Sequence, residues 1–383
     1  MASPPALSFW PFPFSGEVLH AFLDSVTASP DADALLAAMI AHAEAHNPEA
    51  LDYLSAGCDS LREALLSHPA FFSSGEDSVG LLARIAALAA PLHEHFPRGL
   101  PLLLASPDAI ALPRPDVACL LACMFLCALP RPHEECNQVS FAMLFGLPGG
   151  TPAPQKLLCV LHYFERILAV PPRGTLALQR VASPLEQEAA HDFFAACTAP
   201  VLPMEVLLQG SIHDAKGCLQ ADFANKYIGG GVLGGGCVQE EIMFSVAPEN
   251  LVSLLLVPVL GDREALLIAG AERFSAHRGY AGSFAFAGDF VEDCGSVAEG
   301  EACGALTPGS ARTALVGLDA IPFPWRQPQA SQLRPQALLR EMVKASAAFG
   351  LGQAQGWPAE VGLGATPPIA TGNWGCGAFN GAW

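Results

Sequence analysis

Positive charge is scarce in this sequence. Its 383 residues include 19 Lys and Arg against 37 Asp and Glu, which gives a formal net charge of −18. A protein that binds a polyanion over a broad surface needs clustered basic side chains. The composition therefore argues against direct nucleic-acid binding. A bound phosphate group would be held by backbone N–H groups and a helix N-terminus rather than by a lysine cluster.

Long apolar runs and metal-ligand spacings are missing as well. The longest apolar run, VACLLACMFLCAL from Val117, is too short to span a bilayer and is expected to form a buried helix. The N-terminal segment MASPPALSFWPFPFSG lacks the basic start of a signal peptide. The twelve cysteines contain no CxxC pair, and the histidines form no ligand set. We therefore expect unpaired thiols in a reducing compartment, no metal site, no cofactor and no membrane partner.

Glycine is concentrated near the middle of the chain. Residues 222–244 read DFANKYIGGGVLGGGCVQEEIMF, with six glycines in the eight positions 229–236. Because glycine adopts positive φ and has no side chain, consecutive N–H groups of such a loop can turn toward a phosphate. A flexible turn is the alternative interpretation.

Two nucleotide-loop templates fit this segment poorly. A P-loop ends in Gly-Lys-Ser/Thr, whereas Gly236 is followed by Cys237. A GxGxxG pattern is present at Gly229, Gly231 and Gly234, but the acidic residue expected about 20 positions later is missing. These departures disfavour a nucleotide-dependent oxidoreductase.

Two adjacent carboxylates, Glu240 and Glu241, follow the loop. If CVQEEIMF opens a helix, neighbouring side chains point about 100° apart, so one carboxyl faces a reacting centre and the other orients a hydroxyl. Cleavage of a glycosidic bond needs a carboxylic acid whose pKa is raised by burial or by a neighbouring anion. The alternative is a first-turn pair that complements the helix dipole. Asp222 and Asn225 just upstream favour the catalytic interpretation.

Elsewhere the pattern predicts a helical domain over residues 1–170 and an α/β domain over 171–383. Pro breaks separate helices in the first part, with caps expected at Ser29 and Asn47. In the second part strands alternate with helices, which indicates a mixed sheet in a three-layer α/β/α arrangement. We expect strands at 175–182, 201–209, 265–272 and 313–321, helices from 183, 248 and 334, and a long loop at 282–313.

The run DFANKYIGGGVLGGGCVQEEI resembles the signature of the poly(ADP-ribose) glycohydrolase family, a triple glycine followed closely by Gln-Glu-Glu. AERFS and GYA within 271–281, the tripeptide LDA at 318–320 and ATGNWGCGAF at 370–379 match in the same order. Upstream, LPRPDVACLLACMFLCALPRP and KLLCVLHYFERI resemble the family's helical accessory region. The resemblance implies a macrodomain as the catalytic α/β domain.

The resemblance also implies an activity. Glu241 is similar to the acid that protonates the ribose oxygen leaving from a cleaved ribose–ribose bond, and Glu240 to its hydroxyl-binding neighbour. Water then captures the oxocarbenium ion. The implied partners are poly(ADP-ribose) and ADP-ribosylated proteins, and the implied compartments are the nucleus and the cytoplasm.

The other site residues follow from the same resemblance. Asp222 with Asn225 and Gln239 positions the carboxylates or the ribose, and Phe223 supports them. Tyr280 closes over the ligand, and a second loop from Asn373 lines its pocket. The implied contacts of the ligand with the glycine loop and the pocket wall are Gly229, Gly230, Gly231, Val232, Gly235, Gly236, Ile212, Ala378 and Phe379.

Three departures from the family pattern are present. Met243 stands where the family usually has Arg, and the adenine-contacting position falls within 212–214 without a fixed register. The sequence ends at Trp383, so the resemblance predicts a macrodomain that is incomplete at its C-terminus. A catalytically impaired ADP-ribose-binding macrodomain is therefore the alternative to the hydrolase.

Overall fold

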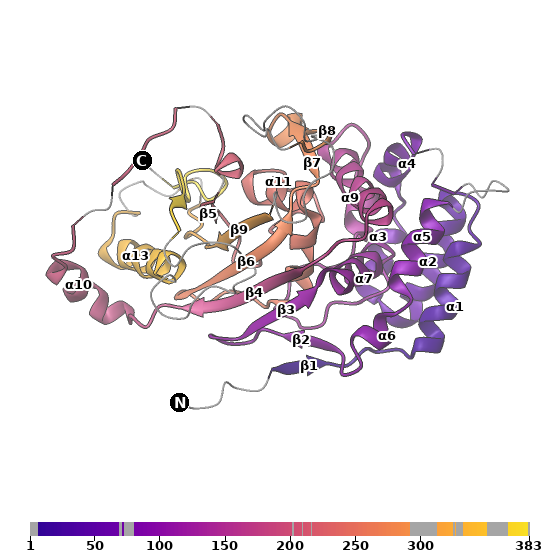
Figure 1. The fold of residues 1–383 in the computed structure, drawn as a ribbon, viewed down its shortest axis with the longest axis horizontal. Helices are drawn as coiled ribbons and strands as arrows, with labels where there is room; N and C mark the ends of the chain where they lie inside the picture. Colours follow the sequence, from indigo (N-terminus) through magenta and orange to yellow (C-terminus); the bar gives the residue numbers. More distant parts are fainter. Residues whose placement is uncertain are drawn as a thin grey trace, which may run out of the picture.

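The computed structural model describes residues 7–68, 71–72, 80–200, 203–208, 210–215, 217–291, 312–324, 326, 332–350 and 367–381. Two parts of the chain meet in it, a bundle of helices from the N-terminal half and a mixed sheet from the C-terminal half (Figure 1). Among the described residues, no helix combines the length and the apolar character that a membrane crossing requires.

The helical part packs around one large apolar core. Its helices are α1 (Gly16–Thr27), α2 (Ala32–His46), α3 (Pro48–Leu54), α4 (Asp59–Leu66), α5 (Leu81–Ala89), α6 (Leu92–His95), α7 (Arg114–Phe125), α8 (Ala142–Gly146) and α9 (Pro152–Ala169). Helix α7 is the buried helix that the run from Val117 predicts, and every residue from Val117 to Phe125 is buried. Asn47 caps α3 as expected, with its Oδ1 accepting from the N–H of Ala50 at 3.3 Å.

The main sheet has six strands in the order β10-β5-β9-β6-β4-β3. Their bounds are β3 (Ala109–Pro113), β4 (Thr175–Ala182), β5 (Leu219–Asp222), β6 (Glu264–Glu272), β9 (Arg312–Gly317) and β10 (Ile369–Ala370). Strands β10, β5 and β9 run parallel, whereas β6, β4 and β3 pair antiparallel with their neighbours. The sheet is therefore mixed, as predicted. Strand β3 comes from within the region predicted to be helical, and the boundary at residue 170 stays a prediction.

Both faces of the sheet are covered, which gives the three layers. Because side chains alternate along a strand, Leu266 and Ile268 of β6 join the core shared with the helical part. Ala265 and Leu267 face the opposite way, into a smaller core with Ala347 of α13 (Pro335–Phe349). Helix α10 (Gln187–Ala196) packs beside α13 on that side (Figure 1).

The layer on the helical side carries the elements nearest the glycine loop. They are α11 (Gln239–Val246), η2 (Pro248–Val252) and α12 (Ser253–Leu256). The helix predicted from 248 is thus a 3-10 turn followed by a single α-turn. Two small antiparallel pairs complete the fold: β1 (Ser8–Trp10) with β2 (Leu100–Leu102), and β7 (Ser275–Arg278) with β8 (Ala285–Asp289).

Several predicted elements are wrong. Of the strand predicted at 201–209, residues 201, 202 and 209 lie outside the described residues. Residues 203–208 form no strand, and Met204 and Leu208 are 84% and 94% exposed because no strand of the described chain covers this apolar segment. Helix α10 begins at Gln187, since Ser183 Oγ accepts from the N–H of Leu185 within a turn rather than capping a helix. Asp31, not Ser29, caps α2.

The loop predicted at 282–313 is only partly described by the structure, and its described first part contains regular elements. Its first part contains η3 (Ala281–Ser283) and strand β8, while residues 292–311 lie outside the described residues. The ten cysteines that the structure describes have free thiols, and the reducing compartment stays a prediction.

Candidate active site

The glycine loop joins the end of β5 to the start of α11. Gly229 and Gly230 have φ angles of +87° and +50°, which only glycine adopts without strain. The loop closes on itself where the N–H of Gly236 donates to the carbonyl of Gly231 at 3.0 Å. A Cβ on Gly231 would lie 3.1 Å from the Gly236 Cα, so this close approach also excludes larger residues.

Glu240 is buried and faces the first turn of this loop. Its Oε1 accepts from the N–H of Gly229 at 2.6 Å, and its Oε2 accepts from the N–H of Asn225 at 2.8 Å. Burial raises the pKa of Glu240, Asp222 and Glu241 raise it further, and the two N–H groups oppose this effect.

Glu241 binds the other turn of the loop. Its Oε1 accepts from the N–H of Gly231 and its Oε2 from the N–H of Val238, both at 2.9 Å. A Cβ on Gly230 would lie 2.7 Å from both Glu240 Oε2 and Glu241 Oε1. The two carboxylates, although adjacent in sequence, therefore converge on one side of Gly230. The loop and the carboxylates form one unit.

Asp222 is the third carboxyl of this cluster. It ends β5, is fully buried, and among the described residues neither of its oxygens has a hydrogen-bond partner. Burial raises its pKa well above the ordinary range, and the charge of Glu241 adds to the shift. The raised pKa values of Asp222 and Glu240 favour retention of a proton within this cluster at neutral pH, and a general acid requires a retained proton.

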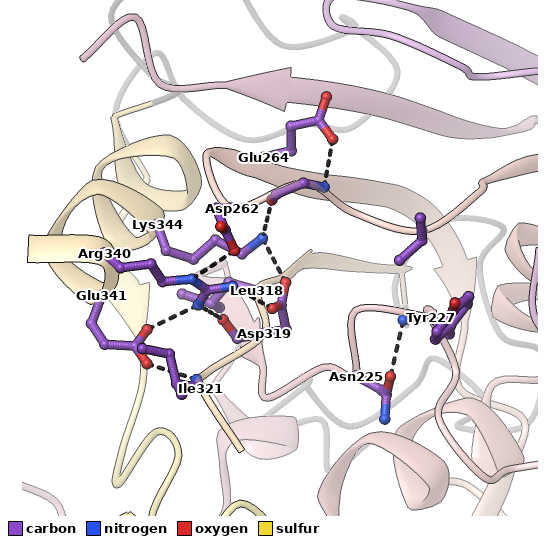
Figure 2. Close-up of polar contacts among 12 residues, drawn as sticks. Asn225, Tyr227, Asp262, Glu264, Leu318, Asp319, Ile321, Arg340, Glu341 and Lys344 are labelled. Carbon is purple, nitrogen blue, oxygen red and sulfur yellow. Dashed lines mark hydrogen bonds and ion pairs between the residues drawn. The ribbon is translucent and has the colours of Figure 1, made fainter. Parts of the chain in front are cut away.

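Gln239 and Phe223 tie α11 to the end of β5. The Gln239 amide accepts from the N–H of Phe223 at 2.8 Å and donates to the carbonyl of Ala221 at 2.9 Å. The Phe223 ring packs beside the smaller core together with Trp374. Asn225 Oδ1 accepts from the N–H of Tyr227 at 3.0 Å (Figure 2), so the turn between β5 and the loop is also fixed.

Tyr280 lies at the rim of the site. It is 54% exposed and precedes η3. Partial burial raises its pKa, a backbone group of Gln239 lowers it, and the charge of Glu241 raises it again. The phenol is therefore placed beside the N-terminus of α11.

The second predicted loop, from Asn373 to Phe379, lies next to the end of β9. Trp374 Nε1 donates to the carbonyl of Leu318 at 3.0 Å, and the carbonyl of Phe379 accepts from the N–H of Phe323 at 2.9 Å. Asn373 and Ala378 are exposed, and among the described residues neither contacts the glutamates. Near this loop a Cβ on Gly372 would meet Phe223 Cζ at 3.7 Å and Ile212 Cδ1 at 3.9 Å, so these predicted pocket residues do lie together.

The end of β9 is fixed by a buried ionic network (Figure 2). Asp319 pairs with Arg340 Nη2 and with Lys344 Nζ of α13, each at 2.5 Å. The Arg340 guanidinium also donates to the carbonyl of Asp319 at 2.6 Å. Glu341 Oε2 accepts from Arg340 Nη1 at 3.0 Å. The network therefore places the Leu318 carbonyl where Trp374 binds it.

Two residues absent from the predicted site lie beneath the glycine loop. Lys156 of α9 donates to three carbonyls of the loop. Asn137 Nδ2 donates to the carbonyls of Ile228 and Gly230 at the start of the loop, and the carbonyl of Tyr227 lies 3.2 Å from the same nitrogen. Lys156 had a detectable signal, because it occupies the same buried stripe of α9 as Val160, Phe164 and Ile167 at helical spacing. Asn137 lies in a non-helical segment and has no such signal.

Comparison with known families decides where this fold belongs. A model of poly(ADP-ribose) glycohydrolase (PARG), macro domain fold, matches residues 191–383, and a model of the PARG helical domain matches residues 76–180. The chain belongs to the poly(ADP-ribose) glycohydrolase family. This confirms the family resemblance and the macrodomain fold preceded by a helical region.

Curated relatives carry the same family name. Poly(ADP-ribose) glycohydrolase 1 of Arabidopsis thaliana is 34% identical over 241 residues, which are 61% of this chain and 41% of that protein. A probable poly(ADP-ribose) glycohydrolase 2 of the same plant is 30% identical over 312 residues, or 69% and 56% of the two chains. Poly(ADP-ribose) glycohydrolase 1 of Caenorhabditis elegans is 30% identical over 309 residues, or 80% and 37%. The chain thus spans 37% to 56% of the length of these three relatives.

Among the described residues, no group of three or more His, Cys, Asp or Glu is arranged to hold a metal ion. The chemistry that these residues offer within a PARG-family site is acid–base chemistry by carboxyls. The backbone N–H groups of the glycine loop add an anion-binding surface beside it.

Proposed function

We propose that this chain hydrolyses the ribose–ribose O-glycosidic bonds of poly(ADP-ribose) and releases ADP-ribose. The observation that carries the proposal is the position of Glu241, whose carboxylate accepts from the N–H groups of Gly231 and Val238 at the N-terminus of α11. A glycosidase acid placed against an anion-binding loop fits a substrate in which each ribose adjoins a diphosphate.

In the proposed reaction, Glu241 donates a proton to the ribose oxygen that leaves. The bond to the anomeric carbon breaks, and the oxocarbenium ion that remains is captured by a water molecule, whose proton returns to Glu241. Glu240 binds the neighbouring hydroxyl. Buried Asp222, 0% exposed, favours the protonated state of the cluster because its own ionisation beside Glu241 is costly.

The rest of the ligand is assigned to the surrounding loops. The diphosphate lies on the N–H groups of the glycine loop, Tyr280 covers the ribose-diphosphate from the rim, and the segment from Asn373 to Phe379 lines the adenosine side. Ile212 and Phe223, which approach each other at Gly372, form part of the same wall. ADP-ribosylated proteins are the proposed partners, with the nucleus and the cytoplasm as the proposed compartments, which imaging of a tagged full chain tests.

The activity test is release of ADP-ribose from labelled poly(ADP-ribose). The wild-type chain is expected to release it, and Glu241→Gln is expected to lower the rate by about 10²- to 10⁴-fold, the usual contribution of a general acid. Glu188→Gln on α10 is the matched control, because this exposed glutamate lies outside the site, and it should retain full activity. Binding of the polymer without release by either protein would support the impaired binding macrodomain. Neither binding nor release would overturn both.

A further inference from the structure

Lys156 reaches from the helical part into the underside of the glycine loop. It is 2% exposed, and its Nζ donates to the carbonyls of Val232, Gly234 and Gly236, each at 2.7 Å. An ammonium group has three donors, so these three bonds use all of them. Among the described residues, no carboxylate oxygen lies within ion-pair distance of this Nζ. The hydrogen-bond acceptors of this charge are therefore peptide carbonyls.

The three bonds fix the direction of three peptide groups. In a trans peptide the C=O of one residue and the N–H of the next point in opposite directions. With the carbonyls of Val232, Gly234 and Gly236 turned toward Lys156, the N–H groups of Leu233, Gly235 and Cys237 point away from it. In the described part of the chain these three N–H groups find no acceptor, and a Cβ on Gly235 would meet open space.

Asn137 also binds carbonyls from one side of the loop, and there the N–H groups on the opposite side already have acceptors. Its Nδ2 donates to the carbonyls of Ile228 and Gly230 at 2.9 and 2.8 Å. The N–H groups of the following residues point the other way and do have acceptors, since Gly229 donates to Glu240 and Gly231 to Glu241. One side of the loop is thus held by the helical part, and the opposite N–H groups serve the site.

We infer that Lys156 is a positioning residue of the anion site: by binding three carbonyls it turns the N–H groups of Leu233, Gly235 and Cys237 into a nest for the diphosphate of ADP-ribose. Successive N–H groups that converge in this way bind anions. The inference rests on the proposed function for the identity of the ligand. It assigns part of the binding site to the helical region rather than to the macrodomain.

The electrostatics of Lys156 give this role a measurable signature. Burial lowers the pKa of Lys156 to about 8, against the opposing effects of the Cys237 thiol and Glu241. Burial also raises the pKa of Cys237, to about 11. A diphosphate bound at the N–H ends of the same peptides favours the charged form of Lys156. Near pH 8, binding of ADP-ribose is therefore expected to be accompanied by proton uptake.

The test is isothermal titration calorimetry with ADP-ribose at pH 8 in buffers of different ionisation enthalpy. Lys156→Met keeps the length of the side chain but removes the donors. We expect it to weaken binding by about 10- to 100-fold, the effect of losing one to two charge-assisted hydrogen bonds. We also expect it to abolish the part of the wild-type proton uptake that comes from Lys156. The carboxyls of Asp222, Glu240 and Glu241 are present in both proteins and cancel in the comparison.

Asn47→Ala is the control for simple destabilisation. Asn47 is also buried in the helical part and its Nδ2 donates to the carbonyls of Cys127 and Leu129, both at 2.9 Å, but it contacts no residue of the glycine loop. This variant should have a lower Tm with unchanged affinity and proton uptake. A folded Lys156→Met with wild-type affinity would overturn the inference. If Lys156→Met does not fold, Lys156→Arg replaces it, because a guanidinium stays charged at pH 8 and keeps its donors. This variant should bind ADP-ribose with less proton uptake than wild type, and equal uptake in the two proteins overturns the inference.

Failure of the proposed function is separable from failure of this inference. If the wild-type chain binds no ADP-ribose, the proposed function falls, and amide hydrogen exchange of the segment 229–238 then decides the role of Lys156. Faster exchange there in Lys156→Met than in Asn47→Ala supports a positioning role. Equal exchange in the two variants overturns it. If Lys156→Met does not fold, wild-type exchange of Gly234 and Gly236, whose N–H groups donate to the carbonyl of Gly231, decides: slow exchange supports an ordered loop, and free exchange overturns it.

Discussion

Two buried lysines hold the two sides of this site in different ways. Lys344, on α13, is 0% exposed and pairs with Asp319 at the end of β9, where Arg340 also binds (Figure 2). Lys156, on α9, is almost as buried but binds only carbonyls. One charge is paired with a carboxylate within the fold, whereas the other is bound by peptide carbonyls.

The difference indicates two roles: Lys344 stabilises the fold, whereas Lys156 orients the N–H groups of the proposed binding site. A cation that is paired with a carboxylate fixes a loop, and its charge needs no further partner. Lys344 fixes the segment that carries Leu318 in this way. A cation bound by carbonyl groups leaves the N–H groups on the other side of the same peptides available to an anion. Burial lowers the pKa of both lysines; Asp319 opposes this effect at Lys344, and Cys237 and Glu241 oppose it at Lys156.

The largest expected effect is on the free energy of unfolding, when the carboxylate that pairs with Lys344 and Arg340 is removed. Asp319→Ala leaves Arg340 and Lys344 as buried cations without their shared carboxylate, which typically costs about 3–5 kcal/mol. Denaturant unfolding measures the loss. Asp262→Ala removes an exposed partner of the same Arg340, a side chain 75% exposed, and is expected to cost about 0–1 kcal/mol. Equal losses in the two variants would contradict the assignment of Asp319 as the centre of the network.

A smaller effect is expected at Asp222, a buried carboxyl that forms no ion pair with any residue the structure describes. Burial raises its pKa in the folded protein, so the unfolding free energy falls as pH rises from the unfolded pKa of about 3.9 toward the folded value and then stays low. Asp222→Asn removes this penalty. It should be more stable than wild type at pH 7, by roughly 1–3 kcal/mol, and the difference should shrink near pH 4.

Thermal or denaturant unfolding at the two pH values measures this difference. Asp319→Asn is the control with the opposite expected sign. The Asp319 carboxylate is paired, so removing its charge should destabilise the protein at pH 7. A variant Asp222→Asn that is less stable than wild type at pH 7 would show that the carboxylate form is favoured in the fold.

Much of the fold follows from local patterns. The continuous apolar runs of β6 and α7 are strong signals, and the glycine loop followed by Glu240 and Glu241 pointed to the candidate site. The segment 203–208 shows the limit, because an apolar run only forms a strand where a neighbour offers its edge. Composition does not contain that information.

The part of the site that escaped prediction is long-range. Lys156 is separated from the carbonyls it binds by 76 to 80 positions, and Asn137 from its partners by 90 to 93. A lysine within an apolar stripe signals that some polar partner must exist, because a buried charge needs one. Which partner it is depends on how the helical part docks against the loop, and only the three-dimensional structure shows that.

We infer that the helical part presets three N–H groups for a diphosphate beside Glu241. Amide NMR of ¹⁵N-labelled, deuterated protein during titration with ADP-ribose observes these groups individually. We expect the largest downfield proton shifts at Leu233, Gly235 and Cys237, with the same amides unshifted in Lys156→Met at equal ligand concentration. Saturating binding of ADP-ribose that leaves these three amides unshifted in the wild-type protein would contradict the account.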